Sequence, residues 1–267
     1  MTSFQKIVKY FAIALAACLI VGIVGGIYRI GSFFFDNDGV LDESRSYSLS
    51  QDFTSIKIEI AGAELTISNS DSFSLESNLK YLSVEEKDGV LILTEAEKHK
   101  SYRDAVLNLT IPRNLSFENI EITTGAGRLT ADTLTANALS LELGAGESEL
   151  AELNVINHAK IEGGTGNITV KSGTLHNLDL SIGVGQLDMT ARLEGSGKLD
   201  CGIGNTELRL IGTADDYCIN LSKGLGNVTL DGVDVKNNAS IGNGEHKIAL
   251  NSGIGNIRVQ FTNPSNH

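Results

Sequence analysis

Glycine triplets are the most regularly spaced residues of this sequence, and glycines in similar patterns bind nucleotides in many enzymes. A Gly-x-Gly triplet occurs eight times between Ile120 and Phe261. The dinucleotide-binding fingerprint also requires a third glycine, three residues after the second, and a helix behind it. None of the eight triplets has this third glycine, and a strand-like segment follows each one. We therefore expect neither a nucleotide nor any other cofactor at these triplets.

The residues directly after the triplets can be compared with those of nonapeptide-repeat solenoids, which bind calcium. Those solenoids place an aspartate after the glycines in a short period. Here the position holds asparagine four times and a carboxylate twice, in a much longer period. Asparagine tolerates left-handed backbone conformations and bonds its own backbone, so we favour a turn-supporting role over calcium. The five histidines have no metal-ligand spacing, and we expect no metal site.

Carboxylates two residues before some triplets address a third chemistry, because paired carboxylates hydrolyse glycosidic bonds. Glu142, Glu162 and Asp200 occupy this position in three repeats. The other repeats have Ser, Thr or Asn there, as expected for a solvated face. We predict no catalytic residues, and the chain is not expected to be an enzyme. A polysaccharide-active β-helix enzyme is the least favoured alternative.

The spacing of the triplets predicts a repeat architecture. Successive triplets begin 19, 20, 19, 19, 22, 18 and 11 residues apart, and a fixed period near this length is typical of repeat proteins. We predict that these glycines form the corners of successive coils, and they are Gly125, Gly127, Gly144, Gly146, Gly164, Gly166, Gly183, Gly185, Gly202, Gly204, Gly224, Gly226, Gly242, Gly244, Gly253 and Gly255.

Apolar residues keep register with the glycines. The position three before each triplet and the position four after it are apolar in all eight repeats. The position two after it is apolar except at Ser148, Thr206 and His246. This alternation predicts half-buried strands, and the change of parity at the triplet requires a corner that glycine permits. We therefore predict an all-β fold, a β-solenoid of 19–20-residue coils. The extra residues at 212–223 predict a protruding loop, and the final spacing of 11 predicts an incomplete coil.

The segment before the triplets is also β-like but less regular. Isoleucines alternate from Ile56 to Ile60, and Ala61-Gly62-Ala63 resembles a degenerate triplet. Asp88-Gly89 is a hairpin turn signal, and a strand ends at Pro112. We predict that residues 51–115 form an N-terminal β region that caps the solenoid, with the solenoid at 116–262 and a tail at 263–267.

The N-terminus predicts a membrane anchor. Residues 10–30 are an apolar run of the length that crosses a bilayer. Lysines precede the run and four acidic residues follow it. The positive-inside rule then predicts a cytoplasmic segment at 1–9, one transmembrane helix at 10–35 and an acidic tether at 36–50, with the remaining chain outside the cell. The predicted location is the cell membrane, crossed once.

The cysteines could in principle carry a lipid or form a disulfide. Cys18 follows Leu15-Ala16-Ala17, a pattern that resembles a bacterial lipobox. We favour an unmodified cysteine inside the helix, because the chain stays apolar up to Phe35. Cys201 and Cys218 stand at different distances from their triplets, so we predict free thiols rather than a disulfide.

The charge balance excludes one class of partner. The net charge is −12, and the first 30 residues carry three Lys or Arg and no acid. The remaining chain therefore has 18 basic against 33 acidic residues. Such an acidic body argues against nucleic acid as a partner.

The order of these features resembles one known family. An opening strand with alternating isoleucines, a GVLIL hairpin, a strand ending in LTIP and tandem coils finish in GIGNIRVQF. This order is similar to the bacterial β-strand-repeat family called "putative adhesin", a domain of unknown function, over about residues 53–261. The resemblance implies a β-solenoid that often stands behind one membrane anchor, an association with envelope-stress systems, and no established catalytic residues.

We therefore expect a membrane-anchored, extracytoplasmic and non-enzymatic binding or scaffold module of the bacterial cell envelope. The alternative is a regulatory or sensory component of an envelope-stress system. The partner, an envelope protein or a glycan, cannot be identified from the sequence.

Overall fold

The computed structural model describes residues 41–95, 104–236 and 238–262. In this part of the chain all regular structure is β, in 17 strands. No helix in it has the length and apolarity that a membrane crossing requires. The predicted segments 1–9 and 10–35, residue Cys18 and the tail at 263–267 lie outside the described residues.

The strands have the following bounds in chain order: β1 (Arg45–Tyr47), β2 (Ser55–Ser70), β3 (Ser74–Ser77), β4 (Leu82–Lys87), β5 (Val90–Glu95), β6 (Val106–Pro112), β7 (Phe117–Val170), β8 (Gly173–His176), β9 (Leu178–Glu194), β10 (Ser196–Ile203), β11 (Thr206–Ile211), β12 (Tyr217–Leu225), β13 (Val228–Leu230), β14 (Val233–Asp234), β15 (Ala239–Ile241), β16 (His246–Ile254) and β17 (Ile257–Thr262).

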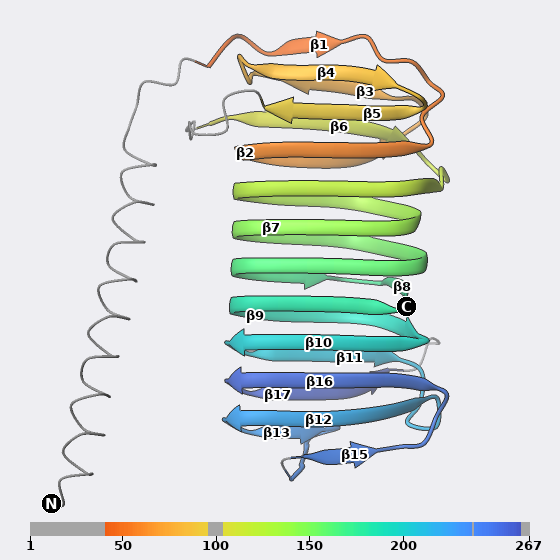
Figure 1. Cartoon of the computed structure of the whole chain (residues 1–267), viewed down its shortest axis with the longest axis vertical. Coiled ribbons are helices and arrows are strands. Elements are labelled where there is room, and N and C mark those ends of the chain that lie inside the picture. Colours follow the sequence, from red (N-terminus) through yellow and green to blue (C-terminus); the bar gives the residue numbers. More distant parts are fainter. Residues whose placement is uncertain (1–40, 96–103, 237, 263–267) are drawn as a thin grey trace, which may run out of the picture.

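The strands wind into a flat stack of coils with two layers (Figure 1). In each coil the chain runs along a first face, turns a corner at a glycine triplet and returns along a second face. Neighbouring coils pair in parallel register, as Leu199 does with Leu180. The single long strand β7 contains three successive coils, because its corners do not interrupt the pairing.

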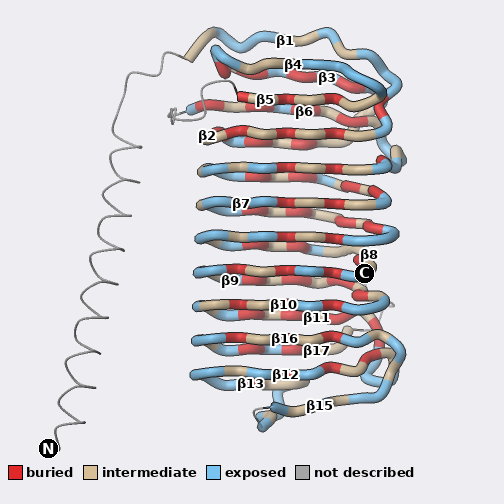
Figure 2. The backbone as a smooth tube through the Cα atoms, in the orientation of Figure 1, coloured by how far each residue is buried: buried red, intermediate tan, exposed pale blue. Residues whose placement is uncertain are grey.

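The core lies between the two faces and confirms the predicted apolar columns. Leu141, Ile161, Leu180 and Leu199, each three residues before a triplet, are fully buried. Buried and exposed residues alternate along every coil (Figure 2). Ser148 and Thr206 also point inward and are buried, so these two exceptions to the apolar pattern keep its geometry.

The spatial order of the coils differs from the chain order at both ends. The coil of β2 lies between β5/β6 and the first coil of β7. The coil of β16/β17 lies between β10/β11 and β12/β13. Residues 51–115 therefore include a full coil of the solenoid, β2, in addition to terminal strands.

This order explains the long spacing at 212–223. The chain must pass over one coil position between β11 and β12, and that passage needs extra residues. The chain makes this passage in a tight turn. In the turn, the Thr213 amide donates to Asp216 Oδ2 at 2.7 Å, and the Asp216 amide donates to the Thr213 carbonyl at 3.1 Å. The predicted protruding loop is thus a compact crossover.

Antiparallel strands cover both ends of the stack. At the N-terminal end β4 pairs with β5, β3 with β6 and β1 with β3. At the C-terminal end β15 pairs with β12 and β14 with β13. Uncovered strand edges expose unpaired backbone groups to other chains, and these short strands reduce that exposure.

The prediction of an incomplete last coil is wrong, and its cause is the seventh triplet. Gly242 and Gly244 are not a solenoid corner; they pack on the backbone of Tyr217 and Asp216. They belong to the return between β15 and β16, where Gly242 has a φ of +73°. The spacing of 11 thus measures from a turn to a corner, and β16/β17 forms a complete coil.

Candidate functional site

The glycine corners lie above one another along one side of the stack, which we call the glycine edge. In Figure 1 the arrowheads of β10, β16 and β12 point to it. From the N-terminal end, its triplets are 61–63, 125–127, 144–146, 164–166, 183–185, 202–204, 253–255 and 224–226. The degenerate triplet Ala61-Gly62-Ala63 is therefore the first corner.

Close contact between the corners explains the glycines. Gly166 has a φ of +144°, and a Cβ built on it would lie 1.7 Å from the Gly146 carbonyl oxygen. The Cβ of a residue at position 164 would lie 2.4 Å from the Gly144 carbonyl oxygen. Neither position accepts a side chain without a backbone shift. The glycines contact one another, so they offer no loop for a ligand.

The middle residues of the triplets point out of the edge, and their character changes along the stack. They are small in the first half, where Gly62, Ala126 and Ala145 stand. In the second half they are Val184, Ile203, Ile254 and Leu225, which are 46%, 51%, 50% and 69% exposed. These four side chains are direct neighbours across the coils. We call this row the aliphatic ridge.

The residues directly after the triplets change one coil earlier, at the triplet 164–166, whose middle residue is Thr165. In the first coils they are Glu64, Arg128 and Glu147, and Arg128 pairs with Glu147 at 2.7 Å. In the later coils they are all carboxamides, namely Asn167, Gln186, Asn205, Asn256 and Asn227. The glycine edge thus has a charged half and an aliphatic half bordered by carboxamides.

The asparagines after the later triplets bond between neighbouring coils, and none of the four has the left-handed φ that the sequence pattern predicted. The Asn256 amide donates to Asn205 Oδ1 at 3.1 Å, and the Asn227 amide donates to Asn256 Oδ1 at 3.1 Å. These side chains therefore link successive coils beside the ridge.

Charged side chains close the two ends of the glycine edge. At the N-terminal end the Ala61 amide donates to Glu95 Oε2 at 2.7 Å. Glu95 is only 1% exposed, and burial raises its pKa. Its Oε1 has no hydrogen-bond partner within the described chain. At the C-terminal end the Lys223 ammonium donates to the Gly226 carbonyl. Glu95 thus offers an acceptor to a backbone N–H group at one end, and Lys223 offers a donor to a backbone carbonyl at the other.

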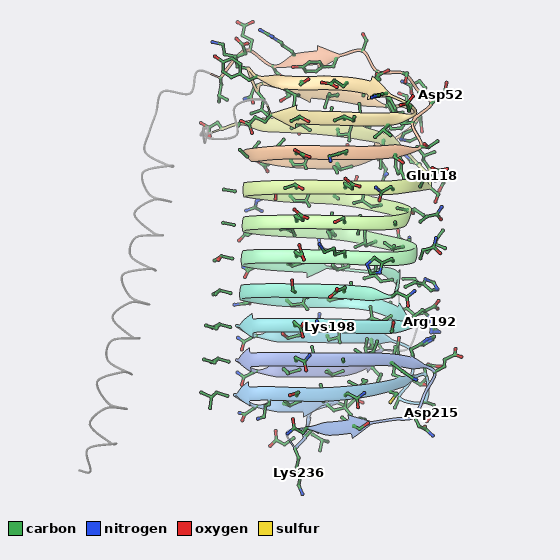
Figure 3. All side chains as sticks on the ribbon, in the orientation of Figure 1. Asp52, Glu118, Arg192, Lys198, Asp215 and Lys236 are labelled. Atoms are coloured by element: carbon green, nitrogen blue, oxygen red, sulfur yellow. The ribbon has the colours of Figure 1, made fainter. Side chains whose placement is uncertain are left out.

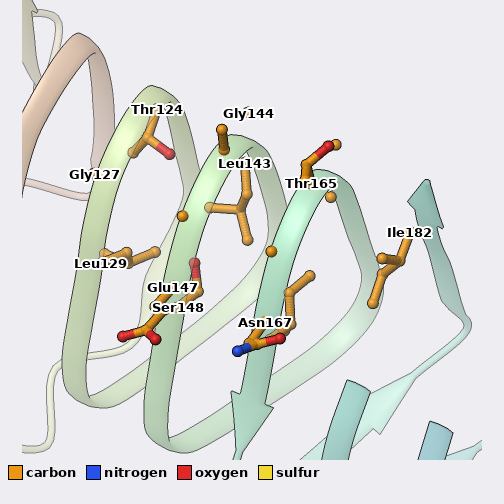
Figure 4. Close-up of a pocket in the computed structure, with 16 residues that line it drawn as sticks. Thr124, Gly127, Leu129, Leu143, Gly144, Glu147, Ser148, Thr165, Asn167 and Ile182 are labelled. Atoms are coloured by element: carbon orange, nitrogen blue, oxygen red, sulfur yellow. The ribbon is translucent and has the colours of Figure 1, made fainter. Parts of the chain in front are cut away.

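A small cavity and open hollows lie near the glycine edge. A cavity of about 20 Å³ lies behind the corners of β7, lined by Leu129, Leu143, Ser148 and Ile182 (Figure 4). It has room for about one water molecule. A shallow hollow of about 530 Å³ on the first face contains Asp200 and Cys201.

The outward carboxylates are engaged in local pairs. Asp200 lies 2.6 Å from Lys198 Nζ and accepts from Asn251 at 2.7 Å, and these contacts lower its pKa. Glu162 lies 3.1 Å from Lys160 and raises the pKa of that lysine. Lys198 lies in the middle of the first face. Arg192 and Asp215 lie at the side of the stack opposite the glycine edge (Figure 3). Asp200 and Glu162 are thus each paired with the lysine two residues before them, and Glu142 and Asp179 also lie near Lys160.

Two of the described histidines, His176 and His246, have structural contacts. His176 contacts the Val155 carbonyl at 3.1 Å and Glu194 at 2.6 Å, and His246 accepts from the Gly195 amide. In the described ranges no group of three or more His, Cys, Asp or Glu could hold a metal. Cys201 and Cys218 are free thiols, as predicted, and burial raises the pKa of Cys201.

Sequence reasoning missed the aliphatic ridge although its signal was present. The pattern search followed strand alternation, and the middle residue of a corner belongs to neither strand. Valine, isoleucine and leucine at that position in four of the triplets were the available sign.

Residues 42–260 match the model of the Toastrack DUF4097 family, and the chain belongs to that family. Among solved structures it is similar to a "putative adhesin" from Parabacteroides distasonis, with 17% identity, a TM-score of 0.41 and coverage of 85% of this chain and 98% of the other. A "putative cell adhesion protein" from Clostridium sporogenes has 16% identity, a TM-score of 0.38 and coverage of 82% and 99%.

A "putative lipid binding protein" from Parabacteroides distasonis has 17% identity, a TM-score of 0.37 and coverage of 80% and 96%. At this level of likeness none of the three structures informs the function. No match is found among curated proteins.

Proposed function

We propose that the chain is a membrane-anchored, extracytoplasmic β-solenoid that acts as a non-enzymatic binding or scaffold module of the bacterial cell envelope. One observation carries the binding role: a straight row of half-exposed aliphatic side chains on the edge of the stack. Contiguous exposed apolar surface in a soluble domain marks an interaction site. The local pairing of the outward carboxylates supports the non-enzymatic role.

The anchor in this proposal is residues 10–35. Their apolarity and the lysines before them favour one crossing with residues 1–9 in the cytoplasm. The described domain then stands outside the cell, on the tether that follows the anchor. Its partner is a protein, a glycan or a lipid of the envelope, and the proposal excludes nucleic acid because the body is acidic.

Cysteine labelling in intact cells tests the topology. Lys236 is exposed at the C-terminal end of the stack (Figure 3), so a Lys236→Cys variant is expected to react with a membrane-impermeant maleimide. A Ser3→Cys variant is expected to react only after permeabilisation. The parent chain measures the background from its own cysteines. Labelling of Lys236→Cys that requires permeabilisation would refute the outward orientation.

A crosslinking experiment in native envelopes separates the scaffold role from a regulatory one. A photocrosslinker at Ile203 is expected to capture an envelope component, with Ile156 as the control position. Capture from positions within residues 10–30 alone would instead favour a regulatory partner inside the membrane.

A further inference from the structure

We propose that the aliphatic ridge rests on the outer surface of a lipid bilayer and holds the solenoid on its edge against the membrane. This inference depends on the proposed anchoring by residues 10–35. It names lipid as the contact of the ridge formed by Val184, Ile203, Ile254 and Leu225.

The first argument is the absence of charge close to the ridge. The residues flanking its four triplets are Ile182 and Gln186, Cys201 and Asn205, Ser252 and Asn256, and Lys223 and Asn227. Lys223 is the one charged residue in this described set, and its ammonium bonds to the Gly226 carbonyl. Apolar side chains bordered by carboxamides suit the boundary between acyl chains and headgroups. The charged half of the edge, with Glu64, Arg128 and Glu147, does not.

The second argument is that the backbone of the ridge is already paired. The Gly204 amide donates to the Ile254 carbonyl at 2.8 Å, and the Gly255 amide donates to the Leu225 carbonyl at 2.8 Å. A partner strand therefore finds few free backbone groups along the ridge, which disfavours strand addition. The contact must be made by the side chains alone.

The third argument is the small area of the ridge. Four half-exposed aliphatic residues present roughly 400 Å², about half of what one partner contributes to a standard protein interface. A second copy of this chain is thus a weak candidate for the occupant. Contact with a bilayer does not require the interface area of a protein complex, because the anchor already holds the domain close to the surface and raises its effective concentration there.

The fourth argument is reach. Residues 36–44 connect the anchor to β1 and span at most about 30 Å when extended. The tether ends at β1, which lies three strand pairings before β2, and the three coils of β7 separate β2 from β9, where the ridge begins. At the usual strand spacing the ridge therefore begins roughly 34 Å along the stack from β1. A stack that lies along the membrane needs the tether only to hold β1 close to the surface, and a reach of about 30 Å allows this with the ridge in contact.

Tryptophan fluorescence provides the test, because the chain has no tryptophan of its own. Full-length Ile203→Trp and Ile156→Trp variants are reconstituted into vesicles of phosphatidylglycerol and phosphatidylethanolamine with brominated acyl chains. Ile156 is the matched control: it is also 51% exposed. It lies where the coil returns from the second face to the first, away from the glycine edge. Quenching by the brominated lipid is expected for Trp at position 203 and not for Trp at position 156.

A second pair of variants measures the apolar contribution. With Val184→Trp as the reporter, Ile203→Ser is expected to lower the ratio of lipid-bound to free ridge by about tenfold, and Ile156→Ser to leave it unchanged. Equal ratios in the two variants would overturn the inference.

The remaining outcomes separate the two proposals. If the chain floats with the vesicles but position 203 is not quenched, the ridge inference is wrong and the anchoring stands. If the chain does not float with the vesicles, the anchoring fails and the ridge inference fails with it. Shielding of position 203 from iodide without quenching by lipid would indicate that a second copy covers the ridge, and would also overturn the inference.

Discussion

The middle coils and the two ends of the stack are held together in different ways. In the middle, coils follow the chain order, pair in parallel and contact each other through glycine on glycine. At the ends the chain order is broken, antiparallel strands are added, and Glu95 and Lys223 meet the last backbone groups of the glycine edge. The repeat thus satisfies its own backbone only while it has a neighbour on each side. At each end, residues outside the repeat pattern must pair with the backbone groups that have no neighbouring coil.

The largest expected effect separates a middle coil from an end coil. Leu180→Asp places an unpaired charge in the fully buried core of a central coil, and we expect a loss of about 4 kcal/mol or more. Because repeat stability is a sum of neighbour contacts, adjacent coils should unfold with it. Denaturant unfolding followed by circular dichroism measures the change.

The matched end variant is Leu230→Asp, in the outermost coil, where the leucine is only half-buried. It should loosen the C-terminal coils alone, with hydrogen exchange in β7 and β9 unaltered. Equal losses for Leu180→Asp and Leu230→Asp would contradict the difference between middle and ends.

A smaller effect is expected at the corners. Gly166→Ala adds a Cβ against the Gly146 carbonyl at a positive φ, and we expect a loss of about 3 kcal/mol. Gly232 also has a positive φ of +79°, but a Cβ there would meet nothing within 4 Å. Gly232→Ala should therefore cost only about 1 kcal/mol. Thermal melts of the two variants isolate the cost of the corner contact, and similar melting temperatures would show that stacking is not what selects glycine.

The sequence predicted the middle of the molecule well and the ends poorly, for a physical reason. The columns that contain Leu180 and Met189 repeat with the triplets, so burial and strand parity follow from spacing alone. The spatial order of the last two coils does not follow from the spacing, because either coil could pack on β10/β11 with equivalent apolar residues. These are Leu221 and Val228 in one coil, and Leu250 and Ile257 in the other.

The observed order of those coils depends on contacts that no period encodes. The crossover turn at Thr213–Asp216 passes over one coil position, and Gly242 packs on Tyr217 in the return to β16. The ridge was equally invisible to a search for strand periodicity, and Glu95 looked like one of many acidic residues before a charged loop. What the repeat determines is readable from its period, and what ends the repeat or covers its edge is not.

The smallest expected effect concerns the N-terminal end, and it depends on pH. Burial raises the pKa of Glu95, so the folded state disfavours the carboxylate relative to the protonated acid. The stability that Glu95 contributes is therefore complete below its ordinary pKa of about 4.3 and is lost as the pH rises through the higher folded value. Glu95→Gln keeps an acceptor for the Ala61 amide and removes the charge. At neutral pH we expect it to stabilise the protein on the scale of one buried hydrogen bond, about 1 kcal/mol.

In acid the gain from Glu95→Gln should vanish, because protonated Glu95 and glutamine then present similar groups to the corner. Urea unfolding of both proteins across this pH range measures the difference. The exposed Glu118→Gln variant is the control, and its effect should be small at every pH. A destabilised Glu95→Gln protein at neutral pH would contradict this expectation and would mean that the charge of Glu95 itself holds the first corner.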